Sequence, residues 1–111
     1  MAYEYEEDLD LLYIKNYDED KKVFTNLVIG NMVIDIAKNG KILGIEIDCA
    51  SKFFKLTPEQ LKSLTIAKIT VLKSINMLCL GIVIGIEPNI EKTFSFIVSP
   101  ESKNVSMSVC S

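Results

Sequence analysis

Carboxylates are the side chains of this sequence best suited to chemistry, because the chain contains neither histidine nor arginine. Seven of its fifteen acidic residues form two groups, one near the start of the chain and one on a predicted β-hairpin. Hard cations such as Ca²⁺ bind several carboxylate and carbonyl oxygens, and a bound cation relieves the repulsion among crowded carboxylates. The sequence therefore predicts a divalent cation site, with calcium as the candidate ion and no other cofactor required. The predicted metal ligands are Glu6, Glu7, Asp8, Asp10, Asp35, Glu46 and Asp48.

The same acidic residues have a second interpretation that needs no ligand. Charged side chains on edge strands discourage aggregation between sheets, which matters in a chain this rich in isoleucine and valine. Runs of charge are usually solvated surface. The acidic groups are therefore also explained as residues that keep the strand edges soluble.

Residues 32–48 are predicted to form the hairpin that holds the second acidic group. Asn39-Gly40 stands between two stretches of alternating apolar residues, a pattern typical of a two-residue type I′ turn. The predicted cross-strand pairs are Met32 with Ile47, Ile34 with Ile45, and Ile36 with Leu43. Their side chains share one face, as a half-buried antiparallel pair requires. On the other face Asp35 stands opposite Gly44, so the three hairpin carboxylates share that face.

Further strands and one short helix are predicted on either side of the hairpin. Strands are expected within residues 3–14 and 23–29 before it, and the alternation of period two returns from residue 65 onward. Thr57-Pro58-Glu59-Gln60 has the pattern of a capping box with proline at the first helical position, which predicts a helix to about Leu64. We expect a single α+β domain over residues 1–111. Its predicted architecture is a mostly antiparallel sheet of about seven or eight short strands with one short helix packed on it.

Two segments carry a resemblance to a known family. The first is Tyr5 to Ile14, an acidic stretch led by tyrosine and followed by Asp10-Leu11-Leu12-Tyr13-Ile14. The second combines Val33-Ile34-Asp35, Gly40 to Ile47 and Ala50-Ser51. Together they resemble the small uncharacterised prokaryotic proteins of domain of unknown function 2283. The resemblance covers about residues 5–64, with additional antiparallel strands in 65–111, and it implies a fold but no activity.

Several function classes are disfavoured by composition. Without histidine, Ser-His and Cys-His nucleophilic schemes are absent, and no phosphate loop, dinucleotide fingerprint or zinc spacing is present, so we expect no enzyme. Residues 1–20 carry eight acids and one lysine, whereas residues 21–111 carry seven acids and eleven lysines. The acidic start and the lack of arginine argue against nucleic-acid binding. No apolar run reaches about 20 residues and no secretory signal is present, which predicts a cytoplasmic protein without a membrane segment.

An interaction module is the alternative to cation binding. Val105 to Ser111 is predicted as a terminal edge strand that is free to pair with an unknown protein partner or a second copy. The isoleucine- and valine-rich run from Ile66 to Ile86 is expected to bury one face either in the core or against another subunit. The scattered cysteines Cys49, Cys79 and Cys110 have no metal-ligand spacing, and we expect them to be reduced.

Overall fold

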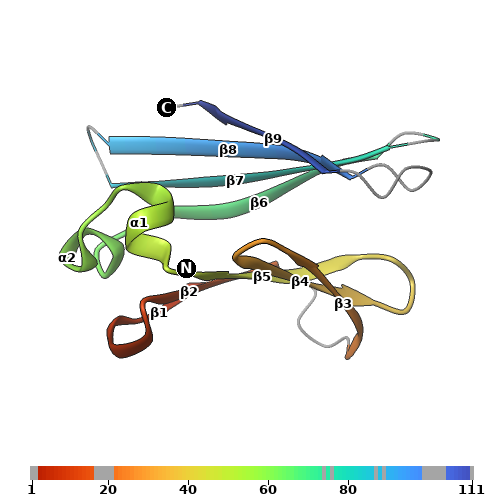
Figure 1. Cartoon of the computed structure of the whole chain (residues 1–111), viewed down its shortest axis with the longest axis horizontal. Coiled ribbons are helices and arrows are strands. Elements are labelled where there is room, and N and C mark those ends of the chain that lie inside the picture. The colour runs from red at the N-terminus through yellow and green to blue at the C-terminus, as the bar shows by residue number, and fades with distance from the viewer. Residues whose placement is uncertain are drawn as a thin grey trace.

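The chain folds as two antiparallel β-sheets stacked face to face, with two short helices at one end of the stack (Figure 1). A computed structural model describes residues 3–16, 22–73, 75, 77–86, 88, 90–98 and 105–110, of which 73, 90–91, 94–98 and 105–110 are described by their backbone. No helix in the described part of the chain has the length and apolar character of a membrane span. The described part of the chain is thus predominantly β, and its two α-helices lie in the connection between the sheets.

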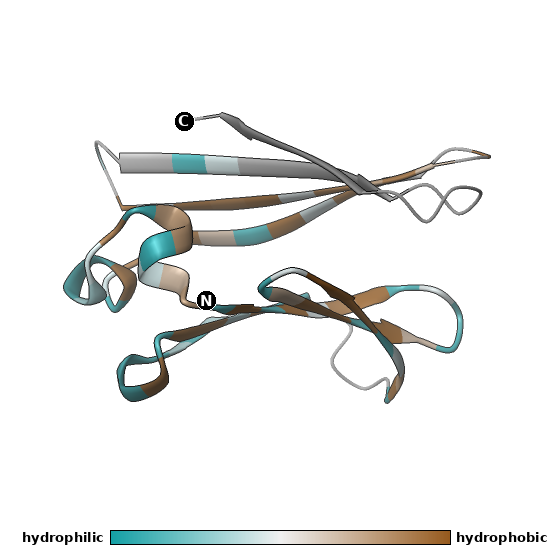
Figure 2. Ribbon diagram, viewed as in Figure 1, coloured by the Kyte–Doolittle hydropathy of each residue, from teal (hydrophilic) through white to brown (hydrophobic). Residues whose placement is uncertain are grey.

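The first sheet has five strands in the order β1-β2-β5-β4-β3. Its strands β4 and β5 are the predicted hairpin. The strands β1 and β2 are added on the β5 side of that hairpin, and β3 is added on the β4 side. The strands are β1 Tyr3–Glu6, β2 Leu11–Lys15, β3 Val23–Ile29, β4 Met32–Ala37 and β5 Ile42–Asp48. Figure 2 shows mainly hydrophobic residues along the hairpin strands β4 and β5 and hydrophilic residues at the turn between them.

The second sheet has four strands in the order β6-β7-β8-β9, so β9 is an edge strand as predicted. The helices α1 and α2 connect the two sheets, with the capping box of Thr57 and Gln60 present at the start of α2. The elements are α1 Ala50–Phe54, α2 Pro58–Leu61, β6 Ile66–Lys73, β7 Leu78–Ile86, β8 Ile90–Val98 and β9 Val105–Cys110.

The core lies between the sheets and is made of aliphatic side chains from both layers. Ile34 and Ile45 of the first sheet are fully buried and directly opposite each other, as the sequence predicts. Ile82 of β7 is fully buried in the same cluster, and Phe54 of α1 closes one end. No polar or charged side chain is buried among those that the structure describes. Burial of this apolar face therefore holds the two sheets together.

The turn of the central hairpin differs from the predicted type I′. Only Gly40 has a positive φ, +87°, while the Gly40 N–H donates to the Ala37 carbonyl and the Ala37 N–H donates to the Lys41 carbonyl. This is the pattern of a type I turn followed by a glycine in a bulge. The bulge shifts the register, so that Ile36 pairs with Ile42 and not with the predicted Leu43.

Two segments are subdivided more finely than predicted. The single strand predicted in residues 3–14 is a hairpin, because Glu7–Leu9 forms a 3-10 turn and Asp10 has φ +50°. The helical region is split because Lys55 has φ +57°, and α2 ends at Leu61 although Leu64 is buried as expected. The result is a five-stranded and a four-stranded sheet with two short helices, in place of one sheet of seven or eight strands with one helix.

Candidate binding face of the five-stranded sheet

The outer face of the first sheet, which points away from the second sheet, carries the hairpin carboxylates. Tyr13 of β2 lies across Gly44 and donates a hydrogen bond to Asp35 Oδ2 at 3.3 Å. Asn26 of β3 donates to Asp35 Oδ1 at 2.5 Å. A Cβ on Gly44 would overlap the hydroxyl and the ring of Tyr13, so this crossing requires glycine. These two hydrogen bonds thus join side chains of β2, β4 and β3 in one polar chain that passes over β5.

Beside this polar chain is a hollow of about 310 Å³ that opens to solvent. Its lining combines apolar side chains, one amide and two carboxylates: Leu9, Leu11, Asn31, Val33, Glu46 and Asp48. Cross-strand pairing explains the composition, because Leu11 is opposite Asp48 and Val33 is opposite Glu46. Leu9 is 62% exposed, which is high for a leucine. The outer face therefore has an apolar floor with negative charge beside it.

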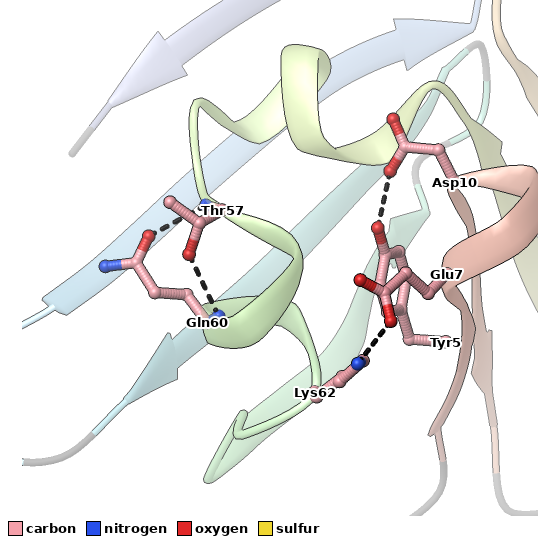
Figure 3. Close-up of polar contacts among 6 residues, drawn as sticks. All are labelled: Tyr5, Glu7, Asp10, Thr57, Gln60 and Lys62. Carbon is pink, nitrogen blue, oxygen red and sulfur yellow. Dashed lines mark hydrogen bonds and ion pairs between the residues drawn. The ribbon is translucent and has the colours of Figure 1, made fainter.

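Asp10 forms a second polar centre, where the first hairpin meets the start of α1 (Figure 3). Its carboxylate accepts hydrogen bonds from the Tyr5 hydroxyl at 2.7 Å, the Ser51 hydroxyl at 2.7 Å and the Ser51 N–H at 3.0 Å. The Asp10 carbonyl accepts from the Ala50 N–H at 3.0 Å. These hydrogen bonds join Asp10 to β1 on one side and to the first residues of α1 on the other, so Asp10 holds α1 on the sheet.

The ionisation of this centre follows from its contacts. Burial, the hydrogen bond to Asp10 and the charge of Asp10 together raise the pKa of Tyr5 to about 12. Partial burial alone would raise the pKa of Asp10, but the hydrogen bonds from Ser51 and Tyr5 outweigh it and lower that pKa below its ordinary value. On the outer face, burial and the nearby Asp35 carboxylate raise the pKa of Tyr13. Both tyrosines therefore stay protonated as donors over the physiological range.

The structure does not bring the seven predicted metal ligands together. Among the described residues, no three acidic or cysteine side chains are grouped so that they could hold a metal ion. The three hairpin carboxylates do share one face, but Asp35 is held by Tyr13 and Asn26 while Glu46 and Asp48 line the hollow. In the first group Asp10 holds Ser51, and Glu7 forms an ion pair with Lys62 that raises the Lys62 pKa (Figure 3). Glu6 and Asp8 are exposed.

The apolar part of the hollow was not predicted from the sequence. Leu11 and Val33 have the ordinary spacing of strand residues, and each comes from a different strand. Their common location depends on the pairing of β2 with β5, which joins segments about thirty residues apart. The alternation of each strand indicates which side chains share a face. It does not indicate which strands are neighbours.

Residues 2–51 match the model of the family described as Protein of unknown function (DUF2283). The predicted resemblance is thereby confirmed. The match ends at Ser51, earlier than the predicted limit near residue 64, and it spans β1 to β5 and the start of α1. No curated protein and no solved structure matches the chain.

The DUF2283 segment therefore coincides with the five-stranded sheet and both of its polar centres. The residues of the hollow, the Tyr13-Asp35 contact and the Asp10-Ser51 contact all lie within residues 2–51. The second sheet lies outside the match and covers the inner face.

Proposed function

We propose that this protein is a non-catalytic binding module whose outer sheet face receives a basic, partly apolar segment of another protein. The observation that carries this proposal is the hollow, in which leucine and valine form the floor and Glu46 and Asp48 supply negative charge. A lysine side chain has an aliphatic stem and a cationic head. Such a side chain buries its stem against Leu11 and Val33 and brings its head to the carboxylates.

The shape and composition of the site support binding rather than catalysis. The volume of about 310 Å³ is at the lower end of the range for small-molecule pockets, and the hollow is shallow. The sequence contains no histidine to move a proton near neutral pH. Carboxylates on an open sheet surface supply charge complementarity, which favours association with a basic partner and makes it sensitive to salt.

Amide chemical shifts during a peptide titration test this proposal. The probe is an extended peptide in which lysine alternates with leucine, and the control peptide replaces each lysine with glutamate. We expect saturable shifts for residues of β2, β4 and β5 with the lysine peptide, weakened at high salt, and none with the glutamate peptide. Glu46→Lys should abolish the response. The matched variant Glu59→Lys, with the same charge change on α2 away from the hollow, should keep it.

Titration with a divalent cation, followed by amide chemical shifts and by melting temperature, tests the cation prediction. Glu46 and Asp48 are the two predicted ligands that line one hollow, so a divalent ion would shift the amides around them. A saturable rise in melting temperature with Ca²⁺, abolished by Glu46→Gln, would favour calcium binding over the peptide. Unchanged spectra with the lysine peptide would refute the proposed binding module. A flat melting temperature with Ca²⁺, Mg²⁺ and Mn²⁺ at millimolar levels would end the cation prediction.

A further inference from the structure

Leu9 lines the hollow from outside the strands of the sheet. It is the last residue of the 3-10 turn Glu7–Leu9, which joins β1 to β2, and its side chain is 62% exposed. Leu11 and Val33, which form the floor of the hollow, belong to β2 and β4 and are only partly exposed. Leu9 thus extends the apolar surface of the hollow beyond the strands.

Asp10 fixes the backbone that carries Leu9. It has φ +50°, a left-handed conformation that aspartate adopts more readily than most residues. Its N–H donates a hydrogen bond to the Glu7 carbonyl at 3.1 Å, which closes the turn. The next residue, Leu11, is the first of β2 and pairs with Asp48 of β5. The conformation of Asp10 therefore sets the direction of Leu9 relative to the floor of the hollow.

Ser51 joins Asp10 to the segment that follows Asp48. The hydroxyl and the N–H of Ser51 both donate to the Asp10 carboxylate, at 2.7 Å and 3.0 Å. Asp48 in turn donates its N–H to the Asn31 carbonyl at 2.8 Å. Leu9, Asn31 and Asp48 all line the hollow. These hydrogen bonds therefore hold its lining residues together at the end of the strands.

We propose that Leu9 selects the segment that binds, and that Asp10 and Ser51 are positioning residues that hold Leu9 for this role. The inference rests on the proposed binding of a basic segment and adds a requirement to it, a bulky aliphatic residue that points the same way as the lysine. Alternate residues of an extended segment share a face, so this aliphatic residue lies two positions from the lysine. The lysine head then meets Glu46 and Asp48, and the aliphatic side chain packs on Leu9.

Two extended peptides of equal charge test the selection. One repeats the order lysine, serine, leucine, serine, and the other has serine in place of each leucine, so only the first presents leucine on its lysine face. From amide chemical shifts, we expect the leucine peptide to bind the native chain about tenfold more tightly than the serine peptide. Leu9→Ala, a change at the surface, should remove this preference and leave the affinity for the serine peptide unchanged.

Ser51→Ala tests the positioning role, because it removes one donor to Asp10 and leaves every lining residue of the hollow in place. We expect the preference for the leucine peptide to fall by about threefold or more, and the methyl signals of Leu9 to shift in the protein without peptide. Ser51→Thr keeps the hydroxyl and should restore both. The matched control is Thr57→Ala, which removes the hydroxyl that caps α2 away from the hollow and should change neither.

Equal affinity of the native chain for the two peptides would overturn the inference, as would a preference that Leu9→Ala leaves intact. This second comparison decides the selection even if Ser51→Ala folds poorly. A preference and Leu9 signals that Ser51→Ala leaves unchanged, or that Thr57→Ala alters equally, would overturn the positioning role. Because the serine peptide reports the basic hollow by itself, failure of the selection and failure of the proposed function are distinguishable.

Discussion

The inner and outer faces of the five-stranded sheet are built from the same strands but differ in chemistry. On β5, Ile45 and Ile47 point inward and are fully buried, whereas Glu46 between them points outward beside the hollow. The inner face is aliphatic and is covered by the second sheet. The outer face carries carboxylates, a tyrosine and exposed aliphatic side chains. Alternation along a strand therefore separates residues that hold the fold from residues available to a partner.

The two faces also differ in how they are ordered. Inner side chains are confined by close packing against many neighbours. The outer face depends on a few directed contacts, mainly the hydrogen bonds that Tyr13 and Asn26 donate to Asp35 over Gly44. When a buried side chain is shortened, the free energy of unfolding falls in proportion to the volume removed. When one partner of a hydrogen bond is removed, the whole contribution of that bond is lost. Substitutions on the inner face test the contribution of packing, and substitutions on the outer face test the contribution of the hydrogen bonds.

The largest expected effect is on the inner face. Ile45→Ala removes a fully buried side chain from the centre of the core and should lower the free energy of unfolding by about 2–5 kcal/mol. The neighbouring Glu46→Ala should change it by less than about 0.5 kcal/mol, because surface substitutions away from packed sites have small effects. Urea denaturation measures both. Similar losses for the two variants would break the distinction between the faces.

A smaller effect is expected at the crossing on the outer face. In Gly44→Ala the new Cβ displaces the Tyr13 ring and breaks its hydrogen bond to Asp35, which should cost about 1–3 kcal/mol. In a Tyr13→Ala background the ring is absent, so the cost of Gly44→Ala should shrink. A double-mutant cycle by urea denaturation measures this coupling. If Gly44→Ala lowers the free energy of unfolding equally in both backgrounds, contact with the Tyr13 ring is not the reason that position 44 requires glycine.

The smallest effect is pH dependence at the Asp10 centre, at the end of the sheet. The Tyr5 pKa is raised from 10.0 to about 12, so its contribution is complete below pH 10 and is lost as the pH rises toward 12. The lowered pKa of Asp10 contributes stability above its ordinary value of 3.8, which is lost as the pH falls through the folded-state value.

Comparison of two variants isolates these contributions. Tyr5→Phe should flatten the alkaline fall in stability relative to the native chain, while Ser51→Ala should reduce the acid-side dependence by removing a donor to Asp10. Denaturation midpoints measured across pH provide the readout. An alkaline profile unchanged by Tyr5→Phe would contradict the role of this hydroxyl. Tyr13, whose pKa is also raised, remains in both variants and serves as an internal reference.

Local patterns in the sequence were sufficient for several elements of this fold. Alternation on both sides of Asn39-Gly40 predicts the central hairpin and places Ile34 opposite Ile45, because neighbouring segments pair in the register that their apolar faces require. The capping box at Thr57 predicts the start of α2, because its hydrogen bonds join residues three apart. The resemblance to DUF2283 is likewise readable from the chain, in Tyr5 to Ile14 and in the hairpin motif, and the family match covers residues 2–51.

Tertiary structure alone decided which distant segments became neighbours. The stacking of two sheets, the pairing of β2 with β5 and the bonds from Ser51 to Asp10 join residues far apart in the chain, where no local pattern selects the partner. The hollow forms only when these distant strands pair. The same pairing gives the acidic residues different roles, because Glu46 and Asp48 line the hollow while Asp10 accepts hydrogen bonds from Ser51. Alternation along each strand establishes which side chains face the same way. Packing determined what they face, because burying the inner apolar surface selects the strand order.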